Sequence, residues 1–152
     1  MVADIEVILW LPKVPNVGHL SLELSDGFYI SFWPEKESRW KKTSRGNTYE
    51  DDRRAEGRGP DEVLYLPPEI VDQEKIKRWW NRVMDDKEYN LMLNNCSSVV
   101  REALRKGGIY EDPVLKGLDA VGRPLDTPSA VFTWAGACKD LYLGKPETAV
   151  NE

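Results

Sequence analysis

The stretch from Asn94 to Gly108 constrains the fold most, because it combines a helix with a reactive side chain at the helix head. Asn94 and Asn95 are residue types that commonly cap a helix N-terminus. Small and apolar residues then recur at helical spacing: Cys96, Val99, Val100, Ala103 and Leu104. Gly107 and Gly108 follow as the expected C-terminal stop signal. The sequence therefore predicts an amphipathic helix whose buried stripe begins with a cysteine.

A cysteine in this position has the means to become a nucleophile. The positive end of the helix dipole and the unsatisfied backbone N–H groups of the first turn both favour thiolate over thiol. A nucleophilic thiolate also needs a base, and the chain contains a single histidine, His19. That histidine lies in a segment that alternates leucines with polar residues, as a strand does. We therefore expect the fold to bring Cys96 and His19 together.

Composition and charge restrict the remaining possibilities. A chain of 152 residues with 41% hydrophobic residues and six tryptophans suits one domain, residues 1–152. The net charge of −5 argues against a dedicated nucleic-acid binder. The two cysteines, Cys96 and Cys138, form no disulfide framework, which favours reduced thiols in a cytosol-like compartment. Cys138 falls on the apolar stripe of a helix and is expected to be a small buried residue.

The sequence gives no indication of a membrane or metal protein. No apolar run reaches the length of a membrane span, and the N-terminus lacks the pattern of a signal peptide. We expect a cytoplasmic protein, while secretion as an effector without a signal peptide stays open. One histidine and no Cys-x-x-Cys pair leave little material for a zinc site. We expect no metal and no cofactor.

The hydrophobic patterns predict an α+β fold with a small antiparallel sheet of about four strands packed against about three helices. Strands are expected at residues 4–11, 17–24, 28–33 and 62–66. Besides the helix headed by Cys96, one helix should follow Asp72 and another should follow Thr127, where Pro128 occupies the first helical position.

The second and third strands are predicted to form a hairpin that determines what surrounds His19. A three-residue loop with Gly27 in the left-handed region puts the apolar residues of both strands on one face. The same loop sets Tyr29, Ser31 and Trp33 on the face of His19. Trp33 is then directly opposite His19, and Ser31 is a diagonal neighbour within side-chain reach.

A polar insertion at about residues 35–60 separates this hairpin from the fourth strand. Because charged residues dominate it, we interpret it as a solvated surface loop whose shortening costs little stability. Two sharper alternatives are a lid over the site and a contact for an anionic surface. Such a contact would use a basic cluster in its first half: Arg39, Lys41, Lys42 and Arg45.

Two short motifs together resemble a known superfamily. They are Gly18-His19-Leu20-Ser21-Leu22 and Asn94-Asn95-Cys96-Ser97-Ser98-Val99-Val100. Histidine on a strand ahead of cysteine on a helix resembles the circularly permuted branch of the papain-like, NlpC-type cysteine enzymes. That branch includes the lecithin:retinol acyltransferase-like and PPPDE families. The later Gly107-Gly108 and Thr127-Pro128-Ser129 also look similar to Rho-inactivation-type domains, which are similar to lysine fatty acyltransferases.

The resemblance implies a papain-like fold with permuted order and gives each site residue an expected role. Cys96 would be the nucleophile and His19 the base, while a third polar residue orients the imidazole. Ser31 fits the hairpin geometry for that third role, and Asp51 or Asp52 would fit the order of the Rho-inactivation-like domains.

Two further parts of the site follow from the same chemistry. The oxyanion of an acyl-transfer reaction would be bound by the Cys96 N–H together with Asn94 or Asn95. Tyr29, Trp33 and Trp40 are candidate substrate contacts, because they offer apolar cover beside the nucleophile.

Two functions from different classes are consistent with these features. In the first, the protein is a cysteine-dependent acyl-transfer enzyme, either a thiol peptidase or amidase or an N-acyltransferase, that forms a thioester on Cys96. Its substrate would be a protein or an acyl lipid, and the aromatic cover favours a fatty acyl donor. The alternative is a non-catalytic protein- or lipid-binding module on the same scaffold.

Overall fold

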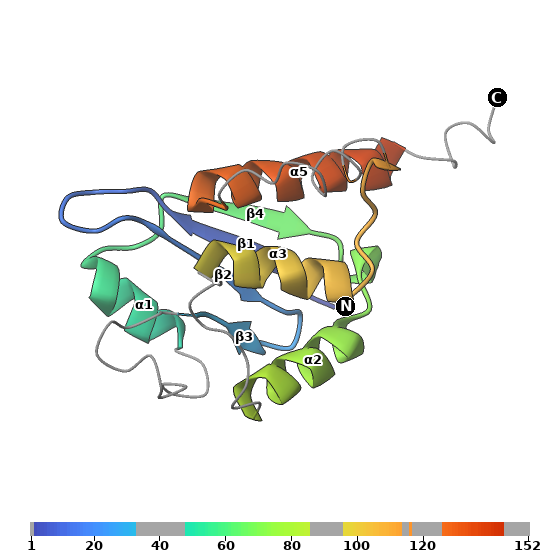
Figure 1. The fold of residues 1–152 in the computed structure, drawn as a ribbon, viewed down its shortest axis with the longest axis horizontal. Helices are drawn as coiled ribbons and strands as arrows, with labels where there is room; N and C mark the ends of the chain where they lie inside the picture. Colours follow the sequence, from blue (N-terminus) through green and yellow to red (C-terminus); the bar gives the residue numbers. More distant parts are fainter. Residues whose placement is uncertain (1, 33–47, 86–95, 114–115, 117–125, 145–152) are drawn as a thin grey trace.

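A computed structural model describes residues 2–32, 48–85, 96–113, 116 and 126–144 (Figure 1). Several predicted site residues lie outside these ranges: Trp33, Arg39, Trp40, Lys41, Lys42, Arg45, Asn94 and Asn95.

The described chain forms a four-stranded antiparallel sheet in the order β3-β2-β1-β4. The strands are β1 (Ile5–Trp10), β2 (His19–Glu23), β3 (Tyr29–Ile30) and β4 (Glu62–Leu66). The predicted α+β class and the four antiparallel strands are confirmed. The third strand is much shorter than the predicted span of residues 28–33.

Three helices cover one face of the sheet: α2 (Gln73–Asp85), α3 (Cys96–Lys106) and α5 (Pro128–Gly144) (Figure 1). A short 3-10 helix, η1 (Pro68–Ile70), leads into α2. The core between these layers includes alternate strand residues and the apolar stripe of each helix: Ile5, Val7, Leu9, Leu20, Leu22, Ile30, Ile76, Trp80, Val100, Leu104 and Val131. Alternation leaves the residues between them facing the other side of the sheet.

The hairpin of β2 and β3 has the three-residue loop that its parity requires. Leu22 pairs with Ile30 and Glu23 with Tyr29, so that residues 25–27 form the turn. Gly27 has φ +91° and donates its N–H to the carbonyl of Leu24 at 3.0 Å. This register turns Ser21 and Tyr29 away from the leucine core, onto the face opposite the three helices.

A fourth helix, α1 (Tyr49–Glu56), corrects the interpretation of the insertion as a solvated loop. Thr48 and Asp51 form a capping box at its start, and Gly57 ends it in the left-handed conformation. Its Asp52 and Glu56 side chains are buried. The described chain therefore contains four α-helices rather than about three. Deleting residues 48–57 is also expected to disturb the interior rather than cost little stability.

Among the described residues, no helix has both the length and the apolar character that are needed to cross a membrane.

Candidate active site

His19 is the first residue of β2 and is fully buried. The preceding Gly18 has φ +91°, and a Cβ there would lie 2.9 Å from the carbonyl oxygen of Trp10. A glycine is therefore required for the chain to enter β2 at this angle. The Trp10 ring also lies against the imidazole, with 5.8 Å between the ring centroids. Backbone and ring together fix the position of His19 at the end of the sheet.

The Nε2 atom of His19 contacts two acceptors on the side of α1. It lies 3.1 Å from Oδ2 of Asp52 and 2.9 Å from Oγ of Ser31. Ser31 in turn donates its hydroxyl proton to Oδ1 of Asp52 at 2.8 Å. Because the serine proton is used in that bond, its oxygen accepts the proton on Nε2. The imidazole is thereby held with Nε2 protonated, which leaves Nδ1 for the side of Cys96.

Asp52 is held by a further hydrogen bond from Tyr29. The Tyr29 hydroxyl donates to Oδ2 of Asp52 at 2.6 Å and lies 2.7 Å from the hydroxyl of Ser21. Burial, followed by the charge of Asp52, raises the pKa of Tyr29, so the phenol stays protonated and can donate. The carboxylate of Asp52 thus accepts bonds from Ser31 and Tyr29 while it faces the imidazole. This pattern favours an ionised, fixed Asp52.

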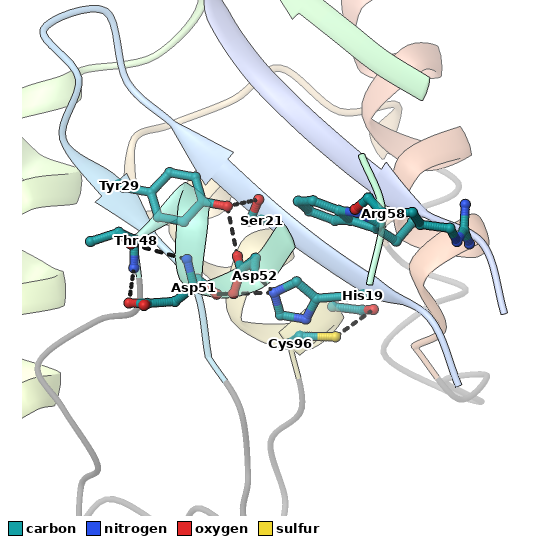
Figure 2. Close-up of polar contacts among 11 residues, drawn as sticks. His19, Ser21, Tyr29, Thr48, Asp51, Asp52, Arg58 and Cys96 are labelled. Atoms are coloured by element: carbon teal, nitrogen blue, oxygen red, sulfur yellow. Dashed lines mark hydrogen bonds and ion pairs between the residues drawn. The ribbon is translucent and has the colours of Figure 1, made fainter. Parts of the chain in front are cut away.

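Cys96 opens helix α3, and its half-buried thiol lies beside the imidazole of His19. Figure 2 shows the imidazole between Asp52 on one side and Cys96 on the other. Burial alone would raise the pKa of the thiol. The hydrogen bond and positive charge of His19 lower this pKa, and together with two smaller effects they exceed the effect of burial. The smaller effects come from the backbone N–H of Leu20 and from the Ser97 hydroxyl, whose oxygen lies 3.7 Å from the Cys96 sulfur. The pKa of Cys96 is consequently below that of an ordinary thiol.

The pKa of His19 is shifted in the opposite direction to that of Cys96. Burial lowers the pKa of His19, but hydrogen bonds with Asp52 and Cys96 and the charges of both raise it to about 9. A histidine with this pKa is protonated at neutral pH. The two opposite shifts favour a thiolate–imidazolium pair, oriented on its far side by the carboxylate of Asp52.

The geometry distinguishes among the three candidates for the orienting residue. Asp52 contacts the imidazole directly and carries the charge, while Ser31 bridges the two side chains. Asp51 points elsewhere, because its carboxylate accepts the N–H of Thr48 at the start of α1. Hydrophobic periodicity could not show which aspartate faces inward, since both lie in a charged segment that lacks it.

The remaining predicted residues divide into two groups. The Tyr29 hydroxyl, expected to contact substrate, is directed at Asp52 instead. The candidate oxyanion residues Asn94 and Asn95 and the candidate substrate contacts Trp33 and Trp40 lie outside the described residues. Cys138 is buried as expected, and burial raises its pKa to about 12.

Comparisons of the chain with protein-family models, curated proteins and solved structures found no match.

Proposed function

We propose that the protein is a cysteine-dependent acyl-transfer enzyme. The observation that supports this proposal most strongly is the contact series from Cys96 through His19 to Asp52. It supplies a nucleophile, a base and an orienting carboxylate, which is the constellation that acyl transfer through a thioester requires. A binding module has no need of a thiolate at neutral pH.

In the first half of the reaction, the Cys96 thiolate attacks the carbonyl carbon of an acyl donor. A carbon–sulfur bond forms, and the carbonyl oxygen gains negative charge. The backbone N–H of Cys96, in the first turn of α3, is available to stabilise that oxygen, because first-turn N–H groups have no partner within the helix. Asn94 or Asn95 would supply a second donor. The imidazolium of His19 then protonates the leaving group, and a thioester remains on Cys96.

In the second half, neutral His19 removes a proton from water or an amine as it attacks the thioester. The carbon–sulfur bond breaks, and the thiolate is regenerated beside the imidazolium. Asp52 keeps the ring in position through both steps and stabilises its charged form. Attack by water makes the protein a peptidase or amidase, and attack by an amine makes it an N-acyltransferase. The permuted papain-like arrangement, with histidine before cysteine, belongs to the same proposal.

The substrate class proposed for the site is a protein or an acyl lipid. Trp33 and Trp40 lie between the two members of the dyad in the sequence, and they would offer apolar cover that favours a fatty acyl donor. Arg39, Lys41, Lys42 and Arg45 would attract an anionic headgroup or an acidic protein surface.

A direct test compares two donor classes. The protein is incubated with a long-chain acyl thioester and, separately, with a peptide library, and the mass on Cys96 and the products are measured. We expect a stable adduct of one acyl group from the fatty donor, which a primary amine then removes. The Cys96→Ser variant should form no thioester. Peptide turnover without fatty acylation would reassign the protein as a peptidase. The absence of both adduct and turnover would favour the binding module.

A further inference from the structure

Glu56 is a second buried carboxylate beside the site, and the proposed chemistry does not use it. It lies four residues after Asp52 on α1, so both side chains project from the same side of the helix. Its side chain is 6% exposed, and neither carboxylate oxygen accepts a hydrogen bond in the described structure. Buried carboxylates are normally paired or hydrogen-bonded, because the desolvation of an unpaired charge is costly.

The groups around Glu56 show what its charge can act on. Asp52 and Asp61 repel it, while His19 and Arg58 attract it. Two of the three guanidinium nitrogens of Arg58 are engaged, because one lies 2.7 Å from Asp61 and another donates to the carbonyl of Leu11 at 2.8 Å, while its Nε is buried without a hydrogen-bond partner. The backbone carbonyl of Glu56 is also held, by the Asn16 side chain at 3.4 Å. Of the two cations, His19 acts on Glu56 more strongly than Arg58 does. His19 also contacts Asp52, which lies one helical turn before Glu56 on the same side of α1.

We propose that Glu56 is a positioning residue that acts through His19: its charge stabilises the imidazolium and so maintains the thiolate of Cys96. No hydrogen bond to the ring is needed, because charges interact over several ångströms in an interior of low dielectric. The inference takes the identity of the dyad from the proposed function, but it concerns ionisation and does not depend on turnover.

The burial of Glu56 gives the proposal a consequence for stability. Burial raises the pKa of this carboxyl, and the positive charges of His19 and Arg58 oppose the change. A buried carboxylate without hydrogen bonds does not help the fold, so a neutral residue of the same shape should be tolerated or should stabilise the protein. A residue that lowers the stability of the fold while it raises the reactivity of a neighbouring group shows the trade-off between stability and activity that is typical of functional sites.

The test uses Glu56→Gln, which removes the charge and keeps the shape. Glu50→Gln is the matched control: it makes the same charge change on the same helix, at an exposed residue paired with Arg53. Because the chain has one histidine, the imidazole signals in an NMR titration are unambiguous. The pH dependence of Cys96 alkylation and the melting temperature are measured on the same samples.

For E56Q we expect the imidazole midpoint to fall by about 0.5–1 pH unit, with a smaller rise in the midpoint of Cys96 and an equal or higher melting temperature. E50Q should leave both midpoints in place. Midpoints that match between E56Q and E50Q would overturn the proposal. A large loss of melting temperature in both E56Q and Glu56→Met would overturn it as well, because Glu56 would then support the fold. If the shift occurs while no acyl donor reacts, the inference stands and the proposed function fails.

Discussion

Replacing His19 by Ala is expected to slow the alkylation of Cys96 by iodoacetamide at pH 6 by roughly 30- to 300-fold. A thiol of ordinary pKa, about 8.5, is only about 0.3% ionised at that pH. The pKa of the wild-type thiol is lowered by the hydrogen bond and charge of the imidazolium and by the N–H of Leu20, so a larger fraction of it is thiolate. The intrinsically weaker nucleophilicity of a low-pKa thiolate offsets part of the gain, which sets the lower end of the range.

The measurement is the rate of mass increase on each cysteine of the native protein. Cys138 serves as an internal control, because it is 2% exposed and its pKa is raised to about 12. It should react only when the protein unfolds. His19→Gln provides a second variant with less loss of volume. Alkylation of Cys96 at the wild-type rate in both variants would show that the imidazole does not activate the thiol.

Replacing Asp52 by Ala should destabilise the protein by about 3–5 kcal/mol, the usual cost of removing one partner of a buried charge pair. Asp52 is fully buried, pairs with His19 at 3.1 Å and accepts hydrogen bonds from Ser31 and Tyr29. Its removal leaves the buried Ser31 hydroxyl without the acceptor of its proton and the imidazolium without its carboxylate. The pKa of His19 should therefore fall, and alkylation of Cys96 should slow together with the loss of stability.

The neighbouring aspartate supplies the matched control. Asp51→Ala removes the carboxylate that accepts the N–H of Thr48, which should cost about 1 kcal/mol, as for other helix caps. It should leave alkylation of Cys96 unchanged. Chemical denaturation of the two variants measures the difference. Equal losses of unfolding free energy would mean that Asp52 contributes no more than a cap.

Sequence patterns were sufficient for those parts of the fold that alternate between apolar and polar residues. The period of 3.6 residues located the helix headed by Cys96, and the parity of the β2–β3 hairpin determined which face carries Tyr29 and Ser31. Leu22 opposite Ile30 is the register that puts every apolar side chain on one face. The burial of apolar side chains determines both the helix and the hairpin register, and the pattern of apolar residues can be read from the sequence.

Helix α1 could not be located in this way, because the side chains that it buries are acids. Asp52 and Glu56 form an inward-facing polar pair on a helix with few apolar residues, so no hydrophobic period marks it. The capping box of Thr48 and Asp51 was a local signal for its start. The polar partners of the buried Asp52 are His19 on β2, Tyr29 on β3 and Ser31 just after β3, all more than 20 residues away along the chain. Such long-range pairing is decided by tertiary structure.

The pKa changes also predict how the site depends on pH. The pKa of His19 is raised above its ordinary value of 6.5, so the stability that the imidazolium contributes is fully present below pH 6.5 and is lost as pH rises through about 9. The lowered pKa of Cys96 has the opposite effect on the pH dependence of stability. The stability that the thiolate contributes is fully present above the ordinary pKa of a thiol and is lost as pH falls through the pKa of the folded state.

The most direct test of the activated Cys96–His19 pair is a joint titration of its two members. Thiolate absorbance at about 240 nm, taken as the difference between wild type and Cys96→Ser, reports the ionisation of Cys96. NMR of the single imidazole reports the protonation of His19. We expect Cys96 to ionise below the ordinary pH of a thiol while His19 stays protonated until about pH 9. An imidazole midpoint near 6.5, with a thiol that ionises only above about pH 8.5, would contradict the account.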